Sequence, residues 1–152
     1  MPVREKTIGF VVFRKEGSGY RFLLLRHEGS YWNFPKGRAE AGESDLDTAR
    51  RELLEETGIS KIKVHENFRH EYDYDFSSVI EEGKRVKIFK RAIFFLGEVE
   101  EGTGDIKISD EHLDYGWFDF KTASRRSFFQ EGRDLLKVAN RWLSLHYQNK
   151  VI

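Results

Sequence analysis

The glutamates between residues 34 and 60 have a spacing that could do chemistry. The segment FPKGRAEAGESDLDTARRELLEETGIS carries Glu43 in its first half and Glu52, Glu55 and Glu56 near its end. With about 100° of rotation per helical residue, the last three fall within an arc of roughly 100°. Neighbouring carboxylates repel one another by a few tenths of a kcal/mol per pair. A cation such as Mg²⁺ would relieve that repulsion, since it binds carboxylate oxygens, waters and phosphates. The alternative interpretation is a solvated helix face, the usual place for charged residues.

The loop before these glutamates favours a cation site. Its sequence PKGRAEAGE supplies a rigid proline, a positive charge at Lys36, and flexible backbone at Gly37 and Gly42. Exposed backbone of this kind can cradle phosphates or offer a carbonyl oxygen to a metal. Cation, loop backbone and carboxylate-bound metal together predict a polyphosphate site, in which the metal neutralises the anion that the carboxylates would otherwise repel.

The element that must position the glutamates is a helix with clear boundaries. Ser44 is a good N-cap, and Asp47 three residues later forms a pair resembling a capping box. One apolar stripe is predicted from Leu46, Ala49 and Leu53. Gly58 stands where a left-handed glycine ends a helix. The three glutamates therefore lie in the last two turns, beside the apolar stripe.

The sequence patterns in the rest of the chain predict several strands followed by two helices. Alternating or β-branched runs predict strands, and runs with helical apolar spacing predict helices. The expected strands are 7–15, 20–27, 61–76 (long or bent), 85–99 and 113–120, and the expected helices are 119–129 and 131–148. Strands 7–15 and 20–27 read as one hairpin, and 61–76 with 85–99 as another. This order predicts one α/β domain, residues 1–152, with a mixed sheet between helices.

Composition excludes several classes of protein. The chain has 152 residues, 26 basic and 26 acidic, so its net charge of zero does not suit a general polyanion-coating protein. It has no cysteine, which excludes disulfides, thiolate nucleophiles and zinc–thiolate sites. No apolar run approaches the length of a membrane span, and the first residues do not resemble a secretory signal. We therefore expect a cytoplasmic protein with no membrane partner.

The glutamate segment resembles the Nudix box, Gly-x5-Glu-x7-Arg-Glu-U-x-Glu-Glu-x-Gly-U, where U is a bulky aliphatic residue. Every position is filled, by Gly37, Glu43, Arg51, Glu52, Leu53, Glu55, Glu56, Gly58 and Ile59. The order of elements is also that of the Nudix family. The resemblance implies a Nudix-type α/β/α sandwich with a mixed sheet between helices, and a metal-dependent pyrophosphohydrolase using Mg²⁺, with Mn²⁺ as the alternative ion.

The resemblance also implies a role for each residue of the box. Glu55 and Glu56 would bind the metal, Glu52 would be a further ligand or the general base, and the Gly37 carbonyl oxygen would complete the set. Structural roles would belong to Glu43, Arg51 and Gly58, with Glu43 and Arg51 pairing to set the loop on the helix. The bound ion would polarise the phosphoryl oxygens, and a carboxylate would take a proton from the attacking water.

Other stretches are similar to the asymmetric diadenosine tetraphosphate hydrolases within that family. These are the FLLL strand, the W-x-x-PKG loop, and IKISDEHLDYGWF, which resembles that subgroup's L-S-x-EH-x-x-Y-x-W stretch. The expected reaction is diadenosine tetraphosphate to ATP and AMP. Glu111 would orient or activate the water, and the expected substrate residues are Lys36, Tyr72, Tyr74, Lys87, Lys90 and Tyr115. Lys87 and Lys90 have odd separation, so at most one faces the site, and each tyrosine has core packing as its alternative role.

Three alternatives remain open at this point. The WNFPKG loop also resembles the RNA 5′-pyrophosphohydrolases, although Lys36 stands where they carry glutamine. A broad-specificity Nudix enzyme could act on nucleoside triphosphates or inositol pyrophosphates. A non-catalytic nucleotide-binding domain is the third, but such domains often lose box glutamates that this chain keeps. We expect a nucleotide polyphosphate as partner, no stable nucleic-acid partner, and a monomer or homodimer.

Overall fold

A mixed β-sheet forms the centre of the molecule. The computed structural model describes residues 3–100 and 105–148. The main strand order is β3-β2-β1-β7-β5, with β4 beside β1, β6 beside β7 and β8 beside β2. Only β1 and β7 pair in parallel among these described strands, and the other pairs are antiparallel. The strands are β1 (Val3–Glu16), β2 (Gly19–His27), β3 (Trp32–Asn33), β4 (Lys36–Arg38), β5 (Ile62–Val64), β6 (His70–Val79), β7 (Arg85–Val99) and β8 (His112–Phe118).

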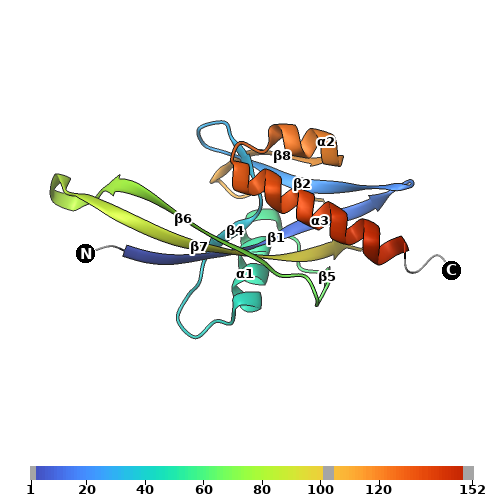
Figure 1. Ribbon diagram of the computed structural model, residues 1–152, viewed down its shortest axis with the longest axis horizontal. Coiled ribbons are helices and arrows are strands. Elements are labelled where there is room, and N and C mark those ends of the chain that lie inside the picture. The colour runs from blue at the N-terminus through green and yellow to red at the C-terminus, as the bar shows by residue number, and fades with distance from the viewer. Residues whose placement is uncertain (1–2, 101–104, 149–152) are drawn as a thin grey trace.

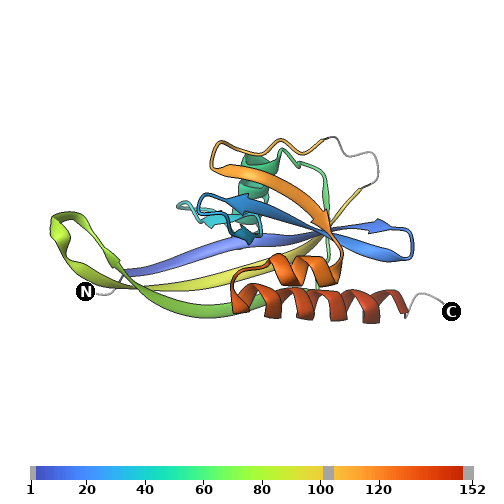
Figure 2. The same ribbon diagram turned by 90° about the horizontal axis from the view of Figure 1, so that it is seen from above.

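Helices cover both faces of the sheet, as expected. Figure 2 shows α1 on one side, and α2 and α3 together on the other. The β6–β7 hairpin and the start of β1 extend beyond the helices as a long arm (Figure 1). The helices are α1 (Asp45–Thr57), α2 (Phe120–Arg126) and α3 (Gln130–Gln148), and a 3-10 turn, η1 (Glu81–Gly83), joins β6 to β7.

Two buried clusters, one on each face, follow from the alternation of side chains along the strands. On the α1 face, Ile8, Phe10 and Val12 of β1 pack with Ala49 and Leu53 of α1. On the opposite face, the residues between them in β1 pack against α2 and α3, and this cluster includes Val11, Phe13, Phe94, Ala123, Leu135, Leu136, Ala139 and Leu143. The position of a residue in its strand therefore decides which of the two clusters its side chain joins.

Helix α1 has the boundaries that its sequence predicts. The Ser44 side chain accepts a hydrogen bond from the Asp47 amide, and Gly58 ends the helix with φ 77°, in the left-handed region. A further bond runs from the Gly58 amide to the Leu54 carbonyl. Both ends are fixed, so the glutamates of the last turns have a defined direction.

Apart from shifts of a few residues at the ends of elements, the structure differs from the sequence-based prediction in two places. Residues 61–76 are not one strand: β5 ends at Val64 and β6 begins at His70. In between, the amide of His65 donates to the Leu96 carbonyl at 2.9 Å and the amide of Phe68 to the His65 carbonyl at 3.1 Å, so the chain turns here. The loop after β2 also contains two short strands, β3 and β4, which the pattern did not predict because neither exceeds three residues.

Candidate active site

Glu56 is the most buried of the three helix glutamates, with 6% of its surface exposed. Its Oε2 accepts a hydrogen bond from the Lys36 amide at 3.0 Å. Burial raises the pKa of Glu56 to about 8; the Lys36 hydrogen bond opposes this shift, while the charges of Glu52 and Glu111 add to it. A carboxylate in this environment is ionised more easily when a cation lies beside it.

Arg51 links the loop to the helix. Its Nε donates to Glu43 Oε2 at 2.7 Å and its Nη2 to Glu43 Oε1 at 3.0 Å, so the expected ion pair between these residues is present. Nη2 also donates to the Arg38 carbonyl at 2.8 Å. Nη1 contacts Glu52 at 3.0 Å and Glu55 at 3.2 Å. One guanidinium thus joins β4, the loop and two of the glutamates.

Gly37 lies directly against Glu52. A Cβ added at Gly37 would overlap the Glu52 carboxylate. Only glycine lets the backbone of β4 come this close to the helix, so its small size matters at this position. Burial raises the pKa of Glu52, with the Arg51 charge opposing the shift and the Glu55 charge adding to it. The β4 backbone and the acidic face of α1 therefore form one surface.

The loop before β8 closes the other side of this surface. Its backbone is bonded to the end of α1, from the Lys107 amide to the Thr57 carbonyl at 2.8 Å and from the Ser109 amide to the Glu56 carbonyl at 3.2 Å. Glu111 lies in this loop, and its charge raises the pKa of both Glu52 and Glu56. The structure therefore brings Glu111 near the helix glutamates, although it is far from them in the sequence.

A groove of about 510 Å³ adjoins this surface at Lys36, whose amide is bonded to Glu56. Lys36 and Lys90 both line it, and its walls are largely aromatic. Tyr74 and Phe76 of β6 form one wall, with ring centroids 6.3 Å apart, and Tyr31 and Phe129, 5.5 Å apart, line the groove as well. The remaining lining residues are Asn33, Tyr72, Asp75, Glu131 and Gly132.

The positive charges of the two lysines at the groove repel each other. Burial is the main cause that lowers the pKa of Lys36, and the charge of Lys90 lowers it further, while Glu56 acts in the opposite direction. Lys90 also lies 3.4 Å from Glu5 Oε2 and above the Phe76 ring. Two cations held near each other would be stabilised by a bound polyanion.

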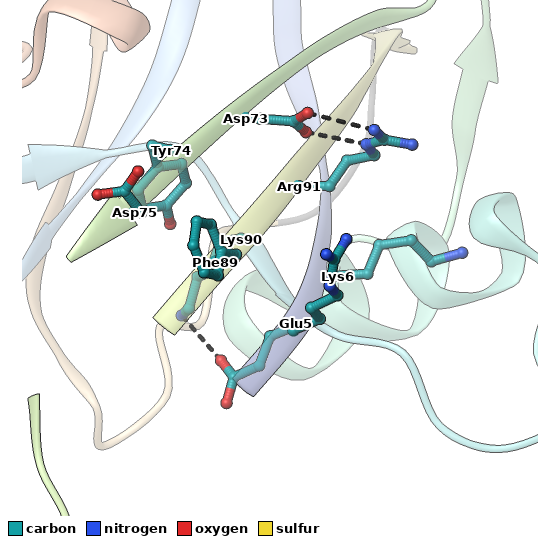
Figure 3. A pocket seen from close by; sticks show the side chains of 9 residues that line it. Glu5, Lys6, Asp73, Tyr74, Asp75, Phe89, Lys90 and Arg91 are labelled. Atoms are coloured by element: carbon teal, nitrogen blue, oxygen red, sulfur yellow. Dashed lines mark hydrogen bonds and ion pairs between the residues drawn. The ribbon is translucent and has the colours of Figure 1, made fainter. Parts of the chain in front are cut away.

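The arm has a second hollow, of about 450 Å³, beside the groove. Figure 3 shows the Asp73–Arg91 pair and the Glu5–Lys90 pair that line it. Lys90 lines both the hollow and the groove, but of the two only the groove also reaches Lys36, whose amide is bonded to Glu56. We therefore regard the aromatic groove as the candidate binding site.

The groove contains some of the predicted substrate residues and not others. Lys36, Tyr72, Tyr74 and Lys90 line it. Lys87 is not among the lining residues; it lies 3.8 Å from Asp75 and above the Phe89 ring. Tyr115 pairs with Leu25, which sets it on the α1 face, where it packs against that cluster. Neither residue lines the groove, because their strand positions direct them to the opposite face, and for the two lysines this agrees with the expectation that at most one of them faces the site.

Sequence reasoning missed seven groove residues, namely Tyr31, Asn33, Asp75, Phe76, Phe129, Glu131 and Gly132. They come from the loop after β2, from β6 and from the start of α3, so no local spacing connects them. The sequence gives no signal for them, since the exposure of the large apolar side chain of Phe129, 44%, is known only from the structure. Exposed aromatic residues beside a polar site are often ligand contacts.

The donor set fits a hard divalent cation. Glu52, Glu55 and Glu56 offer carboxylate oxygens on one side of α1, and the Gly37 backbone lies directly against Glu52. Within residues 3–100 and 105–148, no three acidic or histidine side chains are already grouped to hold a metal ion. Arg51 contacts Glu52 and Glu55 instead. The buried Glu56, with its raised pKa, is the observation that favours a cation here.

No helix in the described part of the chain is long and apolar enough to cross a membrane.

The family model described as NUDIX domain matches residues 3–138. The asymmetrical bis(5′-nucleosyl)-tetraphosphatase of Mus musculus is 33% identical over 148 residues, which cover 91% of this chain and 95% of that protein. The RNA pyrophosphohydrolase of Bartonella henselae is 34% identical over 142 residues, covering 80% and 79% respectively.

Solved structures give the same picture of the fold. A C. elegans Ap4A hydrolase, crystallised as a binary complex, matches with a TM-score of 0.78 and 27% sequence identity. The match covers 92% of this chain and 98% of that one. The dihydroneopterin triphosphate pyrophosphohydrolase of E. coli matches with a TM-score of 0.67 at 19% identity, which bears on the fold alone.

Proposed function

Because this chain belongs to the NUDIX family, we propose that it is a pyrophosphohydrolase of dinucleoside polyphosphates that cleaves diadenosine tetraphosphate to ATP and AMP. The observation that carries the proposal is the groove, which joins two lysines to aromatic walls, and one of these lysines, Lys36, is bonded through its amide to the buried Glu56. A substrate with several phosphates and a terminal base needs all three features. The family match over residues 3–138 supports a single domain, residues 1–152.

The phosphate chain would lie between the lysines and the acidic face of α1. Lys36 and Lys90 would bind phosphate oxygens, which would also relieve the repulsion between their own charges. Tyr74, Phe76 and Phe129 would hold a terminal base by stacking, an interaction worth about 1–3 kcal/mol per base. Such stacking depends little on which base is present, so the tetraphosphate length would contribute more to selectivity than the base does.

The acidic residues would hold the cation and move the proton. Glu55, Glu56, Glu52 and the Gly37 carbonyl are the proposed ligands, for Mg²⁺ or Mn²⁺. When bound, the ion supplies Lewis-acid stabilisation of charge on the phosphoryl oxygens. Glu111 or Glu52 would accept the proton of the attacking water, since both carboxylates lie at this surface. Glu43, Arg51 and Gly58 would keep the loop and helix in place.

One product analysis tests this proposal. Diadenosine tetraphosphate is incubated with the protein and Mg²⁺, and the nucleotides are separated by anion-exchange chromatography. Equal amounts of ATP and AMP support the asymmetric cleavage. Two molecules of ADP per substrate, or no turnover, would reject it. The sequence-based expectations of a cytoplasmic location and of a monomer or homodimer are separate predictions that this assay does not address.

The similarity to the Bartonella henselae protein supports a second candidate, an RNA 5′-pyrophosphohydrolase. The same assay separates the two candidates if it includes a 5′-triphosphorylated oligoribonucleotide. Pyrophosphate release from the RNA at a higher kcat/KM than cleavage of diadenosine tetraphosphate would favour the second candidate.

A further inference from the structure

His112 is a buried histidine that lies against the acidic surface. Its side chain is 1% exposed, and its Nε2 lies 4.0 Å from Glu56 Oε1. This nitrogen has no hydrogen-bond partner among the described residues. Buried ring nitrogens normally have a partner, because leaving one unpaired costs about 1–3 kcal/mol. The nearby Glu56 oxygen is therefore the group in position to pair with this nitrogen.

Ser109 fixes the way His112 presents that nitrogen. The Ser109 hydroxyl lies 3.0 Å from His112 Nδ1. An ionised Glu56 oxygen can only accept a hydrogen bond, so the tautomer with hydrogen on Nε2 avoids lone-pair repulsion. In that tautomer the Ser109 hydroxyl donates to Nδ1, and Nε2–H points toward the carboxylate. A movement of about 1 Å would bring the two atoms to hydrogen-bond distance.

The opposite oxygen of Glu56 is already held. Oε2 accepts from the Lys36 amide at 3.0 Å. We propose that His112 is a positioning residue that holds Glu56 Oε1 while the β4 backbone holds Oε2, so that the carboxylate keeps one orientation toward the cation. The backbone bond from Ser109 to Glu56 ties the two partners to the same point of the helix. The inference rests on the proposed function, because it assigns the role to a cation ligand of that site.

A second histidine packs against the ring of His112. The ring of His27 meets that of His112 edge-on, with centroids 4.5 Å apart. His27 in turn stacks on Tyr31 at 5.0 Å, and Tyr31 lines the groove. Burial lowers the pKa of both histidines, so both rings are neutral at pH 7. A row of packed rings thus connects the position of His112, beside Glu56, to the groove wall.

The test measures the binding of Mn²⁺ alone to the nucleotide-free protein and to its variants by electron paramagnetic resonance. We expect His112→Leu to weaken Mn²⁺ binding about tenfold, the usual scale for a residue that orients a metal ligand. His112→Gln should restore most of the affinity, since its side-chain amide can donate from a similar place. Turnover of diadenosine tetraphosphate should follow the same order, with a loss in kcat rather than in KM.

His65 provides a matched control. It is also buried, its Nε2 also has no hydrogen-bond partner among the described residues, and it lies 3.8 Å from a carboxylate, that of Glu98. His65→Leu should leave Mn²⁺ affinity within twofold of the original protein. If His112→Leu does not fold, Ser109→Ala serves in its place and should weaken Mn²⁺ binding in the same direction.

Two results would overturn the proposal. One is a folded His112→Leu protein whose Mn²⁺ affinity and kcat lie within twofold of the original values. The other is a His112→Gln protein that binds Mn²⁺ no better than His112→Leu. If the original protein cleaves no dinucleoside polyphosphate, yet His112→Leu still weakens Mn²⁺ binding, the proposed substrate is wrong and the positioning role holds.

Discussion

The guanidinium of Arg51 holds the carboxylate of Glu43 through two parallel hydrogen bonds, from Nε at 2.7 Å and from Nη2 at 3.0 Å. This is the two-point geometry that arginine and a carboxylate form best. The Arg51 hydrogen bond is the largest of the causes that lower the pKa of Glu43 to about 2. Arg51 also reaches Glu52. The pair therefore sets the position of the loop and of the acidic surface together.

Replacing Glu43 with glutamine should reduce activity more than it reduces stability. Arg51 would lose its charged partner and shift toward Glu52 and Glu55, which it already contacts. We expect kcat/KM for diadenosine tetraphosphate to fall about tenfold, as for other groups that orient metal ligands. Steady-state kinetics at saturating Mg²⁺ measure this change.

The matching control is the exposed pair of Asp73 and Arg91 on the arm, which has the same two-point geometry at 2.9 Å and 3.2 Å. Asp73→Asn should leave kcat/KM unchanged, since exposed pairs contribute little. Equal losses in Glu43→Gln and Asp73→Asn would contradict a special role for the Glu43–Arg51 pair.

Gly37→Ala should disable the acidic surface, because the new methyl group would occupy the space of the Glu52 carboxylate. Glu52 must then turn away, and we expect kcat to fall on the order of 100-fold, with Mn²⁺ binding weakened as well. Gly19→Ala is the control, since a Cβ there has nothing within 4 Å. The prediction fails if Gly37→Ala retains more than half of the original kcat.

The sequence was sufficient for the parts of the fold and site that depend on local spacing. The caps of α1, the direction of Glu56 and the two hairpins all follow from residues a few positions apart. The groove does not, because Tyr31 and Phe129 meet only after β2 and α3 have packed on the sheet. Alternation along β7 shows that Lys87 and Lys90 face opposite ways, but it does not tell which face carries the groove.

Lys90→Met should raise the KM for diadenosine tetraphosphate about tenfold with a smaller change in kcat. It removes one charge-assisted phosphate contact, of about 1.5–3 kcal/mol, while keeping the apolar stem. Lys87→Met, on the opposite face of the same strand, should leave KM unchanged. Because Lys90 also pairs with Glu5, thermal melting of Lys90→Met and of the double variant with Glu5→Gln separates lost binding from lost stability. The site assignment is wrong if Lys87→Met raises KM as much as Lys90→Met does.

His27 should make the protein less stable in mild acid. Burial is the first cause that lowers the pKa of His27 to about 4, followed by the nearby charges of His112 and Lys36. In the unfolded chain its pKa returns to about 6.5, so between these values the unfolded state binds the extra proton. The stability that His27 contributes is therefore fully present above pH 6.5 and is lost as the pH falls toward 4.

His27→Gln should remove that loss, since glutamine does not titrate. Urea unfolding at pH 7.5 and at pH 5 gives the measurement, and the change in midpoint from pH 7.5 to pH 5 should be more favourable in His27→Gln than in the original protein. The comparison between the two proteins isolates His27, because the raised pKa of Glu56 acts in the opposite direction and the lowered pKa values of His65 and His112 act in the same direction in both. An equal change in the two proteins would show that His27 binds its proton as readily in the folded chain as in the unfolded one.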